Sequence, residues 1–200
     1  MPEPPPADRS DEALMLAYAG GEAAAFDALY SRHKGPAYRY LLRHCGNAAH
    51  ADELFQDVWM NVIRSRTSYA PTAKFTTWLY TLAHHRVVDH WRSNGQVHIV
   101  SIDDDDDPST QASVDALSAP AQDEPAAVVE RHDVRSRIAR ALATLPPAQR
   151  DAFLLHQEAG LPLAEIAAMT GVGAETVKSR IRYALAKLRD ELAALREDPT

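Results

Sequence analysis

The stretch 161-LPLAEIAAMTGVGAETVKSRIRYALAKL-188 predicts two helices joined by a tight turn. Pro162 suits the first turn of a helix, because the N–H that proline lacks would have no partner there. Gly171 and Gly173 bracket the turn, and glycine tolerates the left-handed backbone that a short connection between crossed helices requires. Apolar residues then recur at helical spacing and form one buried stripe: Val177, Ile181, Leu185 and Leu188. The stretch therefore predicts a helix-turn-helix.

The other faces of the second helix are basic and hydroxylic. They carry Thr176, Lys178, Ser179, Arg180 and Arg182. Cations bind phosphates, and Arg, Lys, Ser and Thr side chains reach base edges in the major groove of DNA. A helical hairpin with an ordinary solvated basic face would show the same pattern, so these residues alone leave both interpretations open.

The composition bounds the fold class. A chain of 200 residues with 46% hydrophobic content can form one large or two small domains, and we expect two. Ala, Leu, Arg and Glu are abundant in long periodic stretches, which indicates an all-α protein. The single cysteine, Cys45, excludes an internal disulfide framework and suits a reducing cytosol. The N-terminus lacks the apolar segment of a signal peptide, and the sequence has no run of 18 apolar residues. We therefore expect a cytoplasmic protein.

Charge is segregated along the chain, so the net charge of -7 is misleading. Nine acids and no Lys or Arg lie between Ser101 and Glu130, including the run Asp103 to Asp107. From Arg131 to Arg196 there are eleven Lys or Arg against seven Asp or Glu, a difference of about +4. The part of the chain that carries the predicted helix-turn-helix is thus basic.

The N-terminal half predicts a bundle of helices. Ser10 can cap a helix that Gly20 and Gly21 end. A longer helix follows up to Gly46, and we expect Gly35-Pro36 to kink or interrupt it.

The next predicted helix, about residues 49–64, has one apolar face and one outer face that is acidic, amidic and partly apolar. The outer face carries Asp52, Glu53, Gln56, Asp57, Met60 and Asn61. A solvated face explains the charges, whereas an exposed methionine beside carboxylates favours a protein-binding surface.

The loop after this helix mixes cations with an aromatic side chain: Arg64, Arg66, Tyr69 and Lys74. Such a segment suits an extended nucleic-acid strand, because phosphates attract cations and unstacked bases pack on aromatic rings. A merely polar loop is the alternative. The loop leads into a long helix, Phe75 to Arg92, whose polar side carries His84, His85, Arg86, His90 and Arg92.

The histidine cluster does not predict a metal site. His84, His85, Asp89 and His90 match no zinc motif, and the sequence has no paired cysteines and no glycine-rich phosphate loop. No set of nucleophile, base and orienting residue is evident either, so we expect neither an enzyme nor a cofactor.

Residues 95–125 are rich in Asp, Ser, Ala, Pro and Gln, and their few large apolar groups cannot offset the entropy of ordering. We therefore expect four segments: a disordered tail at residues 1–10, a helical domain at 11–94, a flexible acidic linker at 95–125 and a helix-turn-helix domain at 126–196.

Three motifs in this order carry a resemblance to a known family: ADELFQDVWMNVI, FTTWLYTLAHHRVVDHWR and LPPAQRDAFLLHQEAGLPLAEIAAMTGVGAETVKSRIRYALAKLR. Together they resemble the extracytoplasmic-function (ECF) sigma factors of bacterial RNA polymerase, over most of residues 11–195. The resemblance implies a specificity subunit for transcription initiation, which binds core polymerase and promoter DNA and is commonly held inactive by an anti-sigma factor.

The resemblance also implies roles for the residues singled out above. The outer face of the helix at about 49–64 would dock on the clamp helices of the polymerase. The segment Arg64 to Lys74, with His84, His85 and Arg92, would hold the opened minus-10 element. The second helix of the helix-turn-helix would read the minus-35 duplex. The sequence departs from the family at His85, often Asn, and at Pro162, often a small hydroxyl residue.

Two alternative functions stay open from the sequence. A stand-alone helix-turn-helix regulator would bind operators without polymerase, usually as a two-fold dimer. A scaffold protein made of helical hairpins would not depend on Lys178 or Arg180. The role of the acidic linker is also open: it could compete with DNA for the basic surfaces, follow a cationic channel of the polymerase, or act as a plain spacer.

Overall fold

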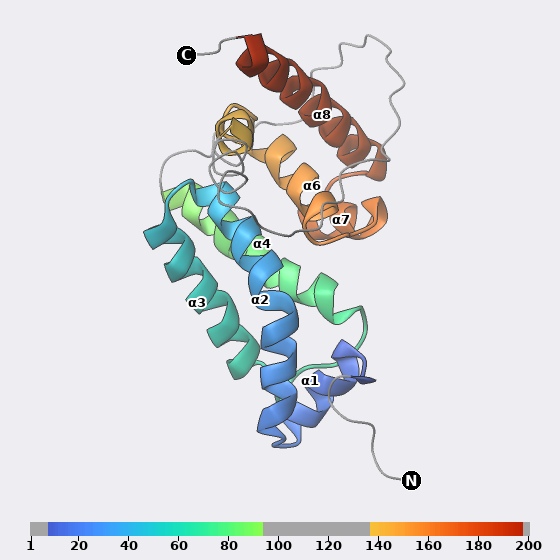
Figure 1. Ribbon diagram of the computed structural model, residues 1–200. Helices are drawn as coiled ribbons and strands as arrows, with labels where there is room; N and C mark the ends of the chain where they lie inside the picture. The colour runs from blue at the N-terminus through green and yellow to red at the C-terminus, as the bar shows by residue number, and fades with distance from the viewer. Residues whose placement is uncertain (1–7, 94–136, 198–200) are drawn as a thin grey trace.

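The computed structural model describes residues 8–93 and 137–197, and all regular structure in these two ranges is helical. The first range contains α1 (Asp11–Ala19), α2 (Ala23–Cys45), α3 (Ala48–Arg64) and α4 (Phe75–Ser93). In the second range residues 137–143 are helical and are followed by α6 (Pro147–Gln157), α7 (Leu163–Thr170) and α8 (Ala174–Glu197). These ranges form two groups of helices, each with its own buried residues (Figure 1). The all-α, two-domain fold class is thus confirmed.

The helices of the first domain begin and end where local chemistry favours it. The Ser10 hydroxyl accepts a hydrogen bond from the Ala13 N–H at 3.2 Å, and the Asn47 amide oxygen accepts one from the Ala49 N–H at 2.8 Å. Gly46 ends α2 in the left-handed conformation, with φ of 64°. The predicted Ser10 cap is confirmed.

One cap connects distant parts of the first domain. The Glu12 carboxylate of α1 accepts a hydrogen bond from the Phe75 N–H at 2.8 Å, where α4 begins. This contact lowers the pKa of the Glu12 carboxyl, because the ionised form is the better acceptor. An acid in the first turn of α1 therefore also stabilises the start of α4.

The long helix α2 runs unbroken from Ala23 to Cys45 with Pro36 inside it, so an interruption at Gly35-Pro36 was the wrong alternative. Residues before and after Pro36, including Leu29, Tyr40 and Leu41, are fully buried against neighbouring helices. Tertiary packing on both sides of the proline thus outweighs the local loss of one helical hydrogen bond.

The second domain has the predicted helix-turn-helix. Gly171 ends α7 with φ of 72°, and its N–H donates to the Ala167 carbonyl at 3.0 Å. Val177, Ile181 and Leu188 of the expected stripe are buried on α8, while Leu185 is half-buried. Pro162 precedes α7 at the N-cap instead of lying in its first turn, since the helix begins at Leu163. Pro147 begins α6, as predicted.

Some sequence expectations fall outside the described ranges. Most of the predicted tail at residues 1–10, all of the predicted linker at 95–125 and the first part of the predicted second domain belong to this group. No helix of the described residues is both long enough and apolar enough to span a membrane.

The two domains pack against each other. Helices α6 and α7 lie along α4 and against the C-terminal part of α2 (Figure 1), and α2 contacts α6 directly. Glu158, the C-cap residue of α6, forms ion pairs with two arginines of α2, Arg39 at 3.1 Å and Arg43. Thr77 of α4 donates a hydrogen bond to Glu165 of α7. This contact surface was not predicted from the sequence.

Candidate functional site

The exposed side of α8 carries the residues that the sequence predicted to contact duplex DNA. Lys178 and Arg182 are exposed; Thr176, Ser179 and Arg180 are half-buried. Lys178 lies 3.7 Å from the Glu175 carboxylate, and the Arg182 guanidinium lies over the Tyr183 ring, 5.1 Å from its centroid. The buried stripe of α8 packs the helix against α6 and α7 and leaves Lys178 and Arg182 exposed, as a groove-reading helix requires, whereas Arg180 faces the other domain.

Helix α3 presents the predicted acidic surface. Asp52, Glu53, Gln56 and Asp57 are exposed, Met60 is 37% exposed, and Asn61 is half-buried. On the opposite side of α3, Ala51, Val58, Trp59 and Val62 are buried, which fixes the rotation of the helix about its axis. The Asp52 carboxylate accepts a hydrogen bond from the Tyr38 hydroxyl on α2, and this contact raises the pKa of Tyr38.

An apolar groove of about 300 Å³ lies beside this surface, between α2 and α3. It is lined by Tyr30, Phe55, Gln56, Trp59, Met60 and Ile63. Its aromatic rings form one connected group, in which Tyr30 contacts Trp59 at 4.9 Å and Phe55 at 6.1 Å between ring centroids. An apolar groove next to an acidic helix face is typical of a surface that receives a helix of a protein partner.

The segment between α3 and α4 holds the predicted strand-binding residues. Arg64, Arg66 and Lys74 are exposed. Tyr69 is half-buried: its ring lies 5.0 Å from Trp78 and 6.4 Å from Phe75, and burial raises the pKa of its hydroxyl. Tyr69 therefore belongs to an aromatic group at the start of α4 and does not extend freely into solvent.

Helix α4 separates its two adjacent histidines. His85 and Arg92 are exposed, and Arg92 and Arg86 both pair with Asp89, at 3.7 Å and 3.1 Å. His84, expected on the polar side, is instead only 9% exposed and lies in the contact between the domains. Within residues 8–93 and 137–197, no group of three or more His, Cys, Asp or Glu side chains could hold a metal ion.

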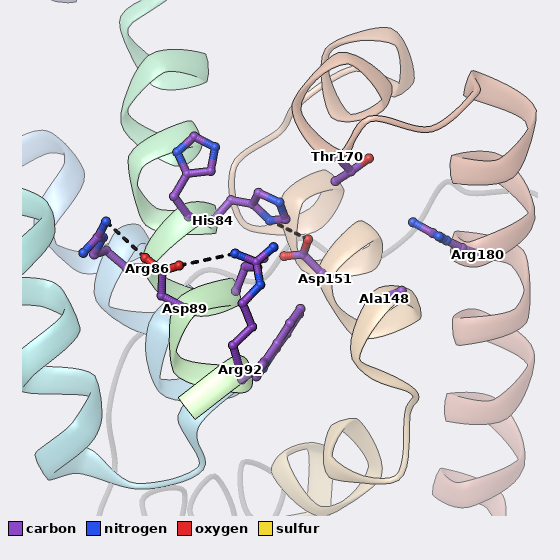
Figure 2. Close-up of a pocket in the computed structure, with 11 residues that line it drawn as sticks. His84, Arg86, Asp89, Arg92, Ala148, Asp151, Thr170 and Arg180 are labelled. Atoms are coloured by element: carbon purple, nitrogen blue, oxygen red, sulfur yellow. Dashed lines mark ion pairs between the residues drawn. The ribbon is translucent and has the colours of Figure 1, made fainter. Parts of the chain in front are cut away.

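A cavity of about 570 Å³ lies between the two domains (Figure 2). Its lining includes His84, His85 and Arg92 of α4 and Arg180 of α8. Residues that the sequence assigned to two different promoter elements are therefore brought to one cavity. Burial lowers the pKa of the Arg180 guanidinium, and the negative charge of Asp151 partly offsets this decrease.

The wall of this cavity contains a buried carboxylate that sequence reasoning missed. Asp151 of α6 is 3% exposed. The Tyr40 hydroxyl donates to its Oδ1 at 2.6 Å, His84 Nδ1 lies 2.8 Å from Oδ2, and His44 Nε2 lies 3.3 Å from Oδ1. Figure 2 shows the Asp151 and His84 side chains meeting between α6 and α4.

The electrostatics of this cluster follow from its burial. Burial alone would raise the pKa of the Asp151 carboxyl, but the adjacent imidazoles of His44 and His84 outweigh burial and lower that pKa. Burial also lowers the pKa of the His44 imidazole and raises that of the Tyr40 hydroxyl. Asp151 is therefore an ionised acid whose partners come from the other domain. The sequence signal was an acid on the apolar face of α6, three and four residues before the buried Leu154 and Leu155.

Comparison with known proteins identifies both domains. The family described as Sigma-70 region 2 matches residues 29–97, and the family described as Sigma-70, region 4 matches residues 135–188. The sigma factor CarQ of Myxococcus xanthus is 31% identical over 181 residues, which cover 90% of this chain and 97% of CarQ. The ECF sigma factor SigL of Mycobacterium tuberculosis is 33% identical and the match covers 88% of this chain and 94% of SigL.

Solved structures show the same fold. CnrH, solved with the cytosolic domain of CnrY, superposes with a TM-score of 0.64 at 23% identity, and the match covers 93% of this chain and 99% of CnrH. RpoE of Bartonella quintana, solved with the anti-sigma factor NepR, gives a TM-score of 0.60 at 19% identity and covers 84% and 96% of the two chains.

Two family matches in the expected order, relatives that align over nearly the whole chain, and a helix-turn-helix domain beside a four-helix domain all agree. Sigma factors are not enzymes; they direct RNA polymerase to promoters and assist initiation. The chain belongs to the ECF sigma factors of bacterial RNA polymerase.

Proposed function

We propose that this sigma factor divides promoter recognition between its two domains. The outer side of α8 reads the minus-35 element as duplex, with Thr176, Lys178, Ser179, Arg180 and Arg182 as the contacting residues. The observation that supports this most strongly is the left-handed turn at Gly171, after which α8 runs with its apolar stripe buried and with Lys178 and Arg182 exposed. Reading intact duplex requires such a groove-filling helix.

The first domain holds the opened minus-10 element. We assign the exposed cations Arg64, Arg66 and Lys74 to the phosphates, and Tyr69, His84, His85 and Arg92 to this same region. Opening DNA without ATP requires that captured, unstacked bases offset the lost stacking energy. Tyr69 and Trp78, which are half-buried beside the fully buried Phe75 at the start of α4, offer flat surfaces for such bases.

The acidic surface of α3, with the apolar groove beside it, docks on the clamp helices of core polymerase. Asp52, Glu53, Gln56, Asp57, Met60 and Asn61 form this surface. The carboxylates of α3 beside an apolar groove suit a helical partner with cationic side chains, because the charges steer association and the groove supplies buried area. This role places the protein in the cytoplasm, where the polymerase acts.

An affinity measurement tests the docking surface. We expect Asp57→Arg to weaken binding to core polymerase about tenfold or more, since it turns an attraction into a repulsion. Asp27→Arg, an equal charge reversal on the exposed side of α2, is the matched control and should bind like the wild type. Equal affinities for the two variants would remove α3 from the polymerase interface.

A template test separates the two DNA surfaces. Lys178→Ala and Arg180→Ala should reduce transcription from a promoter that has an intact minus-35 element, with little further loss once that element is scrambled. Lys74→Ala should reduce transcription from both templates, because its proposed contact is at the minus-10 element. If the α8 variants lose the same factor on both templates, α8 does not read the minus-35 sequence.

We also propose an anti-sigma partner for this chain. The sigma factor RpoE, which has the same fold, was solved with the anti-sigma factor NepR. CnrH, also of the same fold, was solved with the cytosolic domain of CnrY. A protein captured on this chain from its native host should abolish transcription in a reconstituted reaction at a stoichiometric ratio. A host in which no captured protein inhibits transcription would contradict this proposal.

A further inference from the structure

The contact between the two domains is built around one buried charge. Asp151 projects from α6 into the space between α2 and α4, where Tyr40, His44 and His84 contact its two carboxylate oxygens. All the hydrogen-bond and ion-pair partners described for Asp151 thus lie in the first domain. The second domain gains no described hydrogen bond of its own from this acid.

Burial of an ionised carboxylate is strongly unfavourable unless it is paired and hydrogen-bonded. In this chain the pairing exists only while the domains are together, because the hydroxyl and both imidazoles belong to α2 and α4. When the domains separate, Asp151 can be hydrated by water instead. Within its own domain Asp151 also attracts the Arg180 guanidinium of α8. All the hydrogen-bond and ion-pair contacts described for the carboxylate, however, belong to the closed arrangement.

Other contacts fix the orientation of the same interface. Arg150, next to Asp151, donates to the His44 carbonyl at 3.5 Å and also to the Ala143 and Leu145 carbonyls of its own domain, at 2.9 and 3.1 Å. Glu158, at the C-terminal end of α6, pairs with Arg39 and Arg43 of α2. Polar contacts on two sides of Asp151 hold α6 in one register on α2.

The closed arrangement conflicts with the proposed promoter contacts, on which this step rests. His84, His85 and Arg92 share one cavity of about 570 Å³ with Arg180. The centres of minus-10 and minus-35 elements are about 25 base pairs apart, which is about 85 Å along B-DNA at 3.4 Å per base pair. One cavity cannot meet both elements, and the imidazole of His84 is already occupied by Asp151.

We propose that Asp151 and its three partners Tyr40, His44 and His84 form an intramolecular latch, which keeps the free sigma factor closed and must open before the two domains can engage a promoter on the polymerase. The latch makes closure a competitor of polymerase binding. If only a fraction of the free molecules is open, the apparent affinity for core polymerase is the affinity of the open form multiplied by that fraction. Weakening the latch should therefore tighten binding to core polymerase.

Distance measurement in the full-length protein tests the latch. Spin labels at Ala48→Cys and Ala186→Cys, both exposed sites, report on the separation of α3 and α8 in a Cys45→Ala background. The wild type should give one narrow distance distribution. Asp151→Asn keeps the size of the side chain but removes its charge, and it should raise the ratio of open to closed molecules about tenfold or more. Asp190→Asn, an exposed acid of α8, is the matched control.

Tyr40→Phe is the second variant, because it removes one donor to Asp151 from the other side of the interface and keeps the ring packed on Tyr80 and His44. Like Asp151→Asn, it should raise the ratio of open to closed molecules. Circular dichroism should show unchanged helix content in both variants. If Asp151→Asn does not fold, Tyr40→Phe decides the test. A broad distribution in the wild type, or variants that match the control, would overturn the latch.

The affinity for core polymerase provides a second readout. Both latch variants should bind core polymerase more tightly than the wild type by the factor by which their open fraction rises, whereas Asp190→Asn should not. If the variants open but do not bind core polymerase more tightly, closure does not compete with polymerase binding, and that part of the proposal is overturned. The distance measurement needs neither DNA nor polymerase, so failure of the promoter assignments would leave its outcome unaffected, and the two proposals can fail separately.

Discussion

The contact between Glu12 and the start of α4 gives a prediction with a definite pH dependence. The change is Glu12→Gln, which keeps an oxygen acceptor for the Phe75 N–H but removes the negative charge. A side-chain cap contributes about 1 kcal/mol to stability, and a negative charge near a helix N-terminus contributes a further ~0.5 kcal/mol. Because Gln keeps part of the hydrogen bond, we expect a loss of about 1 kcal/mol at neutral pH, or ~3 °C in melting temperature.

The sign of the pH effect follows from the direction of the shift. The pKa of Glu12 is lowered in the folded protein, so its contribution is present above the unfolded value of about 4.3 and is lost as pH falls through the lower folded value. The difference between wild type and Glu12→Gln should thus be full at pH 7 and should shrink below about pH 4.

Thermal unfolding followed by circular dichroism at several pH values measures this difference. Asp27→Asn, which removes an exposed carboxylate of α2, is the control and should not reproduce the pattern. A constant difference between pH 7 and pH 3.5, or no difference at pH 7, would refute the role assigned to the Glu12 carboxylate.

Three further predictions concern the helix-turn-helix and the free thiol. Gly171→Ala places a Cβ at φ of 72°, so it should destabilise the second domain by about 1 kcal/mol in thermal unfolding even though no atom lies within 4 Å of that Cβ; an unchanged melting temperature would contradict the strained turn. For Lys178→Ala, the affinity for promoter DNA should be measured at several salt concentrations with polymerase present. The slope of log affinity against log salt should become shallower by about 0.9, the value for one phosphate contact, and an unchanged slope would remove Lys178 from the DNA interface. Cys45, whose pKa burial raises to about 11, should react with a thiol reagent at pH 7.5 about a hundredfold more slowly than a free thiol, and a rate equal to that of the free thiol would show that the side chain is accessible.

Much of the fold follows from local sequence patterns. The turn at Gly171, the start of α6 at Pro147 and the cap at Ser10 each depend on a few adjacent residues, and the structure has all three. Pro36 shows where local rules fail: a proline disfavours a helix interior, but burial of α2 on both sides of it outweighs that cost.

The contact between the domains could not be predicted in the same way. Tyr40 and Asp151 are 111 positions apart, and no local pattern joins them. Histidine and aspartate on helices usually lie on solvated faces, so His84 and Asp151 each had an ordinary interpretation. Only their joint burial shows that each is the partner of the other. The same contact explains why His84, expected on an open polar side, is covered in this structure.

The measurement that tests the central claim most directly is run-off transcription on a set of genomic fragments, with core bacterial RNA polymerase, this protein, or both. We expect specific transcripts to require both components, to be strongly reduced by Asp57→Arg and to be unaffected by Asp27→Arg. A protein that shifts specific duplex fragments alone in a gel and leaves core polymerase inactive on every fragment would be a self-sufficient regulator, and that result would contradict its role as a polymerase subunit.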